Sequence, residues 1–529
     1  MPASPLPAKP ELNGRGRIAL PILLTILFCA IVFFESHYKL LWGDEFVTYW
    51  VGQRCSFRGI WSALAAGADP NPPLMHVLNW ASTSFFGSNS VAIRLPSTLG
   101  VALALVSLWA LLRRFVAPVY AATGCLMLMT MRGFDYAYDA RSYGLLLGFA
   151  TASLAAWVIA NAATGPRRIV WLALMALALA CALSSNYYGV LAFFPLAAGE
   201  LSLLHRTRKL KIGPWLAMLI ASLPLLAYRG LIRTNIAEFG PHAWNKPQLS
   251  MVAESYFVLV EGIFWPIFVL AVVLLWRRKR DKPVRPSPLP QELTTALWIA
   301  LGYPVLGYLI AYFGAGMISA RCVIPVCAAF AFAGAILLAR LAGRRATILV
   351  LCGLIFWVGA REAACAYLIR QQRHAFFRLR DHIERSAAPG ETVVVSDSLT
   401  LMPLYWYSSA GMRRQIVFPI DFDLIHRYAA EDSGEQNLWG GRHGVFPAAI
   451  DKPGALVPLD AESILVADPN GWLAKTLQSE GFVLQPDPAP IAWDQLGGVF
   501  TGLAHEETHV FFAVPPSANI PPAEVSSKP

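Results

Sequence analysis

Residues 18–46, "IALPILLTILFCAIVFFESHYKLLWGDEF", decide the fold class of this chain. The apolar part of the stretch approaches the ~20 residues that a helix needs to cross a bilayer. Two adjacent carboxylates, Asp44 and Glu45, follow shortly after it. We therefore expect a membrane helix that presents an acidic pair at one membrane surface.

The composition extends this interpretation to most of the chain. Of 529 residues, 56% are hydrophobic and 14% are charged, which is typical of a polytopic α-helical membrane protein. The net charge of +10 would also suit nucleic acid, but surplus Lys and Arg is common in the cytoplasmic loops of membrane proteins. Apolar windows predict about eleven transmembrane helices, at 18–34, 92–112, 116–131, 142–160, 169–183, 189–204, 213–231, 252–275, 293–313, 320–340 and 346–367.

The charges between these helices predict the orientation. Basic residues cluster in every second loop, at 113–114, 167–168, 206–211, 277–285 and 344–345, and Arg15 and Arg17 precede the first helix. Because cytoplasmic loops carry the excess of Lys and Arg, these loops and the N-terminus should be cytoplasmic. An odd number of crossings then places the chain after about residue 368 outside.

Four segments are expected. Residues 1–17 form a disordered cytoplasmic N-terminus, and 18–367 form the membrane domain with a large first outer loop at 35–91. Residues 368–515 are predicted to be a soluble extracytoplasmic α/β domain, because strand-like runs such as "ETVVVSD" and "SILVAD" alternate with helical ones. No glycine-rich nucleotide fingerprint occurs there. Residues 516–529 form a disordered tail.

The first outer loop should contain short helices of its own. One is expected to begin with Asp44 as N-cap. Another is expected at "NPPLMH", with Asn71 as N-cap and Pro72 at the first helical position. Asp44 and Glu45 then have two interpretations: a helix cap beside a solvated charge, or a general base and a ligand for a divalent cation.

The second outer loop is "RGFDYAYDAR", residues 132–141. Its tyrosines are typical of the aromatic belt at a membrane surface. Arg141 either anchors to lipid headgroups or binds a phosphate with its planar guanidinium. Arg94 and Arg321, at the outer starts of two other helices, have the same two interpretations. Three isolated arginines on the outer side run against the positive-inside bias, which favours an anionic ligand.

Other chemistry finds less support in the sequence. His76 is a single histidine, and such residues are more often packed or hydrogen-bonded than metal-ligating. No His/Cys cluster has zinc spacing, and no phosphate-binding loop lies on the cytoplasmic side. The predicted helices contain few charges near their centres, whereas ion-coupled transporters are expected to carry some.

Four outer-side segments resemble those of the bacterial GT-C-type glycosyltransferases that use polyprenyl-phosphate sugars. They are "WGDEF", "NPPLMHVLNWASTSFFGSNSVAIRLPS", "YAYDARSYGLLL" and "ARCVIP", and their order adds to the likeness. The group includes dolichyl-phosphate-mannose protein-mannosyltransferase-like proteins, lipid A aminoarabinose transferases and lipopolysaccharide galacturonosyltransferases. Two positions depart from its pattern, because Cys322 stands where relatives often have Tyr and Asn71 where some have a charged residue.

The resemblance implies a function and a site. It implies an inverting transferase in the bacterial inner membrane that moves a sugar from a polyprenyl-phosphate donor to a glycolipid, lipopolysaccharide or protein on the periplasmic side. Asp44 would be the catalytic base and Glu45 its supporting neighbour, while Asp139 and Arg141 would lie near the donor phosphate. The candidate substrate-binding set is Asn71, His76, Arg94, Asp139, Arg141, Tyr143 and Arg321.

The cofactor and the exact function stay open at this point. No cofactor is assigned, and a divalent metal ion is the one candidate considered. The enzyme alternative is an O-antigen ligase or polymerase, and the non-enzyme alternatives are a lipid or glycan transporter and a membrane-anchored sensor. No nucleic-acid partner is expected.

Overall fold

A computed structural model describes residues 14–241, 243–262, 287–429, 432–453, 463–487, 493–494 and 507–516. The chain forms two compact units. The first comprises residues 1–37, 71–233 and 245–366, and the second comprises 38–70, 234–244 and 367–529. The predicted first outer loop, 35–91, is therefore divided between them. Most of the predicted disordered ends, 1–17 and 516–529, lies outside the described residues.

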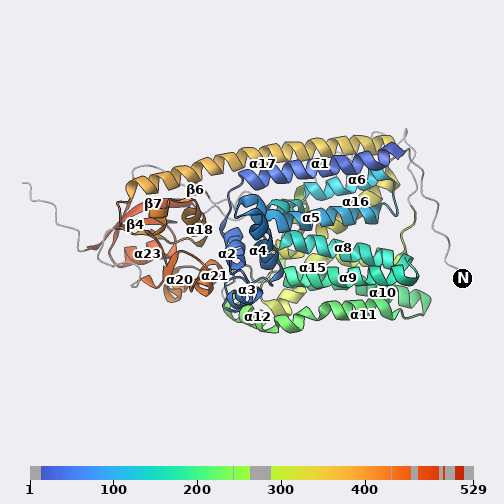
Figure 1. Ribbon diagram of the computed structural model, residues 1–529, viewed down its shortest axis with the longest axis horizontal. Helices are drawn as coiled ribbons and strands as arrows, with labels where there is room; N and C mark the ends of the chain where they lie inside the picture. The colour runs from blue at the N-terminus through green and yellow to red at the C-terminus, as the bar shows by residue number, and fades with distance from the viewer. Residues whose placement is uncertain are drawn as a thin grey trace, which may run out of the picture. The chain divides into compact units, whose positions relative to one another are not determined.

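The first unit is helical, and most of its helices are apolar enough to lie in a membrane. Within it, α8 packs against both α5 and α9 (Figure 1). Its α-helices are α1 (Gly14–Tyr38), α4 (Leu74–Phe86), α5 (Ser90–Leu112), α6 (Pro118–Thr130), α7 (Arg132–Asp135), α8 (Tyr143–Ala162), α9 (Gly165–Ser185), α10 (Phe193–Thr207), α11 (Ile212–Ser222), α12 (Pro224–Phe239), α14 (Gln291–Leu301), α15 (Tyr303–Ile310), α16 (Val326–Leu341) and α17 (Arg344–Ser386). The C-terminal ends of α1, α12 and α17 belong to the second unit. Shorter helical turns are η1 (Tyr136–Tyr138), η2 (Tyr187–Ala192), η3 (Ala311–Ala315) and η4 (Ala320–Val323).

Among the described residues, seven helices are long and apolar enough to cross a membrane, or eight if a bent pair counts as one. The prediction of a polytopic membrane protein is thereby confirmed, and the count of eleven stays a prediction. Two further predicted spans correspond to the shorter apolar helices α6 and α16. The predicted span 252–275 is helical as far as residue 262, and the rest of it lies outside the described residues.

The bent pair is α14 and α15, which meet at an angle of 57°. Pro304 lies in the first turn of α15, directly after the break at Gly302. A proline removes one backbone donor and its ring clashes with the preceding turn, so a bend at this position has a local cause.

Helix α17 is one continuous helix of 43 residues. The sequence predicted a span ending at residue 367 and a separate amphipathic helix, but no break separates them. At 1.5 Å per residue such a helix is about 65 Å long, roughly twice the hydrocarbon thickness of a bilayer. The polar C-terminal half of α17 must therefore extend beyond a membrane that its apolar half crosses.

The second unit combines α2 (Gly43–Gly52), α3 (Phe57–Ala65) and the chain after residue 367. In its described part, β-strands form a sheet in the order β3-β2-β1-β4-β7-β5, with β6 also paired to β7. Strands β1 (Val393–Val395), β2 (Ile416–Pro419), β3 (Ala449–Asp451) and β4 (Ser463–Ala467) run parallel, and β5 (Val483–Pro486), β6 (Trp493–Asp494) and β7 (Glu507–Val514) pair antiparallel. The helices between them are α18 (Ser398–Tyr407), α19 (Ala410–Arg413), α20 (Phe422–Tyr428), α21 (Ser433–Gly441) and α23 (Trp472–Ser479).

Candidate functional site

The second outer loop forms a compact turn between α6 and α8. After α7 and η1 the chain becomes extended at Asp139, and the N–H of Arg141 donates to the carbonyl of Asp139 at 2.7 Å. Helix α8 begins two residues later, at Tyr143. Asp139 and Arg141 are both buried, and they lie immediately before the first turn of an apolar helix of membrane-spanning length.

Hydroxyl groups of α5 hold this turn by its backbone. Ser97 Oγ donates to the carbonyl of Arg141 at 2.5 Å, and Thr98 Oγ1 donates to the carbonyl of Ala137 at 2.6 Å. Both acceptors are backbone oxygens of buried residues. The two hydrogen bonds therefore satisfy buried carbonyls and fix the turn on α5.

Glycines allow α5 and α8 to approach this closely. A Cβ at Gly100 would lie 2.5 Å from the backbone of Gly144, and a Cβ at Gly148 would lie 2.2 Å from the carbonyl oxygen of Gly100. Small residues at such contacts let membrane helices pack backbone to backbone. Ser97 lies about one turn before Gly100, which brings its hydroxyl to Arg141.

Asn71 joins three segments that are distant in the sequence. Its Oδ1 accepts hydrogen bonds from Ser142 Oγ at 3.3 Å and from Asn186 Nδ2 at 3.2 Å, and all three side chains are buried. The expected N-cap role of Asn71 is wrong, because α4 begins at Leu74 with Pro73 at its N-cap. Asn71 instead fastens the entry to α4 to the starts of α8 and η2.

Aromatic rings and a guanidinium meet next to Arg141. The rings of Tyr136 and Tyr143 are 5.1 Å apart, and the Arg321 guanidinium lies 5.4 Å from the centre of the Tyr143 ring. Burial raises the pKa of the Tyr136 phenol, the Arg321 charge lowers it, and Tyr143 and Asp139 add to the rise. Tyr136 therefore stays protonated at neutral pH.

Arg94 and His76 are also buried in the first unit, with relative exposures of 0% and 1%. Arg94 donates to the carbonyl of Ser36 at 2.9 Å, in the last turn of α1. A cation at the C-terminal end of a helix interacts favourably with the helix dipole. This contact gives Arg94 a structural role, and its predicted part in ligand binding stays a prediction, as does that of His76.

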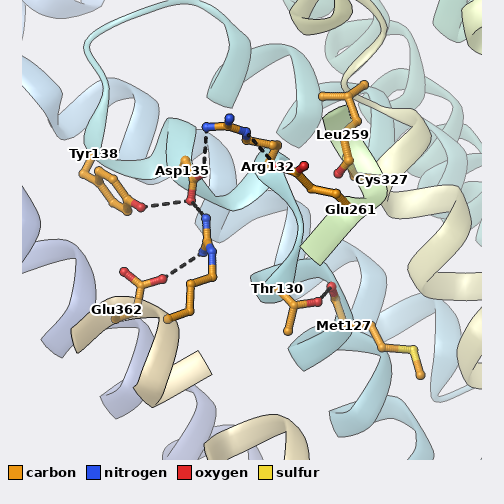
Figure 2. A network of polar contacts seen from close by, with 10 residues as sticks. Met127, Thr130, Arg132, Asp135, Tyr138, Leu259, Glu261, Cys327 and Glu362 are labelled. Atoms are coloured by element: carbon orange, nitrogen blue, oxygen red, sulfur yellow. Dashed lines mark hydrogen bonds and ion pairs between the residues drawn. The ribbon is translucent and has the colours of Figure 1, made fainter. Parts of the chain in front are cut away.

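An ionic network supports the same loop from α17 (Figure 2). The carboxylate of Asp135 accepts from Tyr138 Oη at 2.9 Å and from Arg361, whose other terminal nitrogen donates to Glu362 at 2.9 Å. Arg132 lies 4.0 Å from Asp135 on one side and 3.6 Å from Glu261 on the other. The network thus connects the start of the turn to two other helical segments.

The acidic pair belongs to the second unit. Helix α2 begins at Gly43 with Trp42 at the N-cap, so Asp44 lies in the first turn and the expectation that it is the N-cap is wrong. Glu45 is fully buried, and its carboxylate accepts a long hydrogen bond of 3.4 Å from the Trp42 N–H. Asp44 is half-buried and so accessible to solvent. The two neighbours have different environments.

A metal site has little geometric basis in the part of the chain that the structure describes. No group of three or more His, Cys, Asp or Glu side chains gathers there as metal ligands would. The buried carboxylate of Glu45 is already used at the helix start.

Sequence reasoning missed several residues that build the turn. The sequence predicts Tyr136 only as a belt aromatic, and it does not distinguish Ser142, Asn186 or Arg361. Ser and Asn are common caps at the ends of membrane helices. Nothing in one sequence therefore distinguishes Ser142 and Asn186 from other serines and asparagines at helix ends. Arg361 is the exception. An arginine inside a predicted transmembrane helix is rare, and it indicates a buried acidic partner.

Residues 70–228 match the family model described as dolichyl-phosphate-mannose-protein mannosyltransferase. A structure of ArnT from Cupriavidus metallidurans bound to undecaprenyl phosphate matches with a TM-score of 0.56 and 13% identity, over 93% of this chain and 98% of that one. The apo structure of the same ArnT matches with a TM-score of 0.54 and 15% identity, over 96% and 99%. No curated protein sequence matches the chain.

The two comparisons agree. The family match includes α4, α5, the buried turn and α8, and the structural match covers nearly the whole of both chains. At this level of identity the second match shows a shared fold. Together they confirm the predicted resemblance to the GT-C-type membrane glycosyltransferases.

Proposed function

We propose that the chain moves a sugar from a polyprenyl-phosphate donor to an acceptor on the periplasmic side of a bacterial inner membrane, with inversion of the anomeric carbon. The observation that carries the proposal is the buried turn before α8, where Asp139, Arg141 and the Arg321–Tyr143 pair gather. Buried arginines at a membrane-helix end are costly unless they serve a purpose such as binding an anion. The similar ArnT was solved with undecaprenyl phosphate, which supports a lipid phosphate as that anion.

In this proposal the turn binds the donor. The guanidinium of Arg141 holds the phosphate through paired N–H donors, and Arg321 adds a second positive charge. As the bond between the anomeric carbon and the phosphate oxygen breaks, the phosphate leaves with the electron pair. Fixed positive charges stabilise the charge that develops there, so no separate acid is needed.

Asp44 acts on the acceptor. Its half-buried carboxylate accepts the proton of the acceptor hydroxyl while that oxygen forms a bond to the anomeric carbon. Attack from the face opposite the phosphate inverts the configuration. Glu45 is buried and fixes the helix start beside Asp44, which suits a supporting rather than a proton-transferring role.

The test uses purified full-length protein with a panel of polyprenyl-phosphate-linked hexoses and pentoses, and product mass as the readout. We expect Asp44→Asn to lower turnover by about 100- to 10,000-fold, the usual range for loss of a general base. Arg141→Ala should lower it by about 100- to 1,000-fold, as for loss of one charge-stabilising donor.

Arg167→Ala is the matched control, because Arg167 is an exposed arginine in the first turn of α9, which follows the far end of α8. It should retain full activity. Turnover by Asp44→Asn at the wild-type rate would rule out Asp44 as the base. Unaltered donor affinity and rate in Arg141→Ala would contradict the proposal that the turn binds the donor phosphate.

A further inference from the structure

Helix α2, which carries Asp44, has one aromatic face. Phe46, Tyr49 and Trp50 stand at spacings of three, four and one residues, which places them on adjoining parts of the helix surface. Phe46 is fully buried and Tyr49 nearly so. What covers this face lies in the same unit, about 350 residues further along the chain.

Trp406, near the end of α18, covers it. The Trp406 ring centre lies 5.6 Å from that of Phe46, 5.1 Å from that of Tyr49 and 5.7 Å from that of Trp50. The Tyr49 and Trp50 contacts are edge-to-face, the arrangement that aromatic pairs favour. One side chain of the α/β part thus packs against the whole aromatic face of α2.

Two further contacts fix the residues around Asp44. The hydroxyl of Tyr407 accepts a hydrogen bond of 3.1 Å from the Leu41 N–H, three residues before Asp44. A Cβ at Gly43 would lie 2.8 Å from Leu399 Cδ2, so the first residue of α2 touches the first turn of α18. Contacts with α18 therefore lie on both sides of Asp44 in the sequence.

Helix α18 is itself well held. It follows β1 directly, and Asp397 caps it by accepting from the N–H groups of Leu399 and Thr400 at 3.1 and 2.8 Å. At its other end the Tyr407 ring packs against Phe376 and Phe377 of α17, at 5.6 and 5.8 Å. The sheet and α17 thus define where α18 lies, and α18 defines where α2 lies.

We propose that the α/β part of the second unit positions the Asp44 carboxylate through α18, with Trp406 as the positioning residue. The proposal rests on the function proposed above for Asp44. It gives the C-terminal part of the chain a role in the reaction without contact to substrate. Since a displacement of about 1 Å can cost about 100-fold in rate, loss of the Trp406 ring should act mainly on kcat.

The experiment compares kcat and donor KM for four variants of the full chain, using the polyprenyl-phosphate sugar that gives product with wild type. Trp406→Ala should lower kcat by about 10- to 100-fold and change KM by less than about twofold. Trp406→Phe, which keeps a ring, should restore much of the loss. Tyr407→Phe removes only the hydrogen bond to Leu41 and should lower kcat by a smaller factor. Tyr405→Ala is the control, because its ring lies 5.9 Å from the Arg413 guanidinium within the same α/β part.

A double mutant separates this role from general destabilisation. If Trp406 acts through Asp44, then Trp406→Ala should cost little more in an Asp44→Asn background, so that the two losses do not multiply. Full multiplication of the losses, or wild-type kcat in Trp406→Ala, would overturn the proposal. If Trp406→Ala does not fold, the double-mutant cycle is run with Tyr407→Phe, and unchanged kcat in that variant overturns the proposal.

The outcomes distinguish the two proposals. Wild-type turnover by Asp44→Asn contradicts the proposed base whatever Trp406 does. An inactive Asp44→Asn together with a fully active Trp406→Ala contradicts the positioning role alone.

Discussion

Neighbouring carboxyl groups in this protein have different environments. Glu45 is buried and used at a helix start, whereas Asp44, one residue earlier, is half-buried. Sequence analysis could find the pair, because two acidic residues after an apolar run are conspicuous. It could not tell them apart by burial, because burial depends on which distant elements pack against α2, and α18 is one of them.

Asp397, the N-cap of α18, should make the stability of the folded chain depend on pH. Burial raises the pKa of its carboxyl, against the hydrogen bonds from Thr400 and Leu399 that lower it, and Asp468 nearby adds to the rise. A raised folded-state pKa means that the folded chain holds the proton more tightly than the unfolded chain does. The resulting stability is complete below the unfolded-state pKa and is lost as pH rises through the folded-state pKa.

We therefore expect Asp397→Asn to change the pH profile of thermal unfolding. The side-chain amide stays neutral and retains an oxygen for the helix cap. Relative to this variant, wild type should be more stable at pH 4 than at pH 7, as measured by Tm in detergent. A constant Tm difference between the two proteins across that range would show that Asp397 does not titrate with folding.

At the scale of elements, the turn before α8 depends on contacts from α5 and α17. The sequence predicted the turn as an outer loop with charged and aromatic residues, but not the elements that hold it. Ser97, Gly100 and Arg361 acquire their roles only when particular helices become neighbours, and periodicity in one sequence does not identify neighbours. For the same reason the long first outer loop could not be divided between two units from sequence.

The ionic contact between Arg361 and Asp135 should stabilise the first unit. Removing the cation by Arg361→Gln leaves Asp135 and Glu362, each with 9% side-chain exposure, without their shared partner. Breaking such a buried pair typically costs about 3–5 kcal/mol. We expect a loss of that order in the free energy of unfolding, and a smaller loss when Asp135→Asn is added.

The matched control is Arg206→Gln. Arg206 pairs with Glu292 at 2.9 Å, but its side chain is 49% exposed. Exposed pairs contribute about 0–1 kcal/mol because water screens them. Equal losses in Arg206→Gln and Arg361→Gln, measured by denaturant unfolding in the same detergent, would contradict the tethering role of Arg361.

At the scale of the whole molecule, the charge pattern predicts which loops lie on each side of the membrane. One native thiol can test this orientation. Cys55, between α2 and α3, is exposed, and the other exposed cysteines, Cys29 and Cys352, lie within the membrane helices α1 and α17. If the first outer loop is periplasmic, a membrane-impermeant maleimide added to intact spheroplasts should label the protein at Cys55.

Cys55→Ser should lose this label without loss of folding. Labelling of wild type only after the membrane is permeabilised would reverse the orientation. The result decides which side of the membrane holds Asp44, because α2 ends only a few residues before Cys55.

The presence of several membrane-length apolar helices could be predicted from sequence, because hydrophobic length acts locally along the chain. The strand-like runs at 391–397 and 463–468 likewise coincide with β1 and β4. Sequence could not predict that α17 continues past residue 367. Hydropathy falls there, which resembles the end of a membrane helix, although no proline or glycine interrupts the helix at that point.

The edge strands of the sheet affect whether copies of the protein can aggregate through their sheets. In the described part of the sheet, β3 and β5 lie at the two edges and are only three and four residues long, and β5 ends in Pro486. Short strands offer few unpaired backbone groups to a strand from another molecule, and proline offers no donor. Both edges are therefore poor templates for strand addition, which protects newly made chains from sheet-to-sheet aggregation while the rest of the protein inserts.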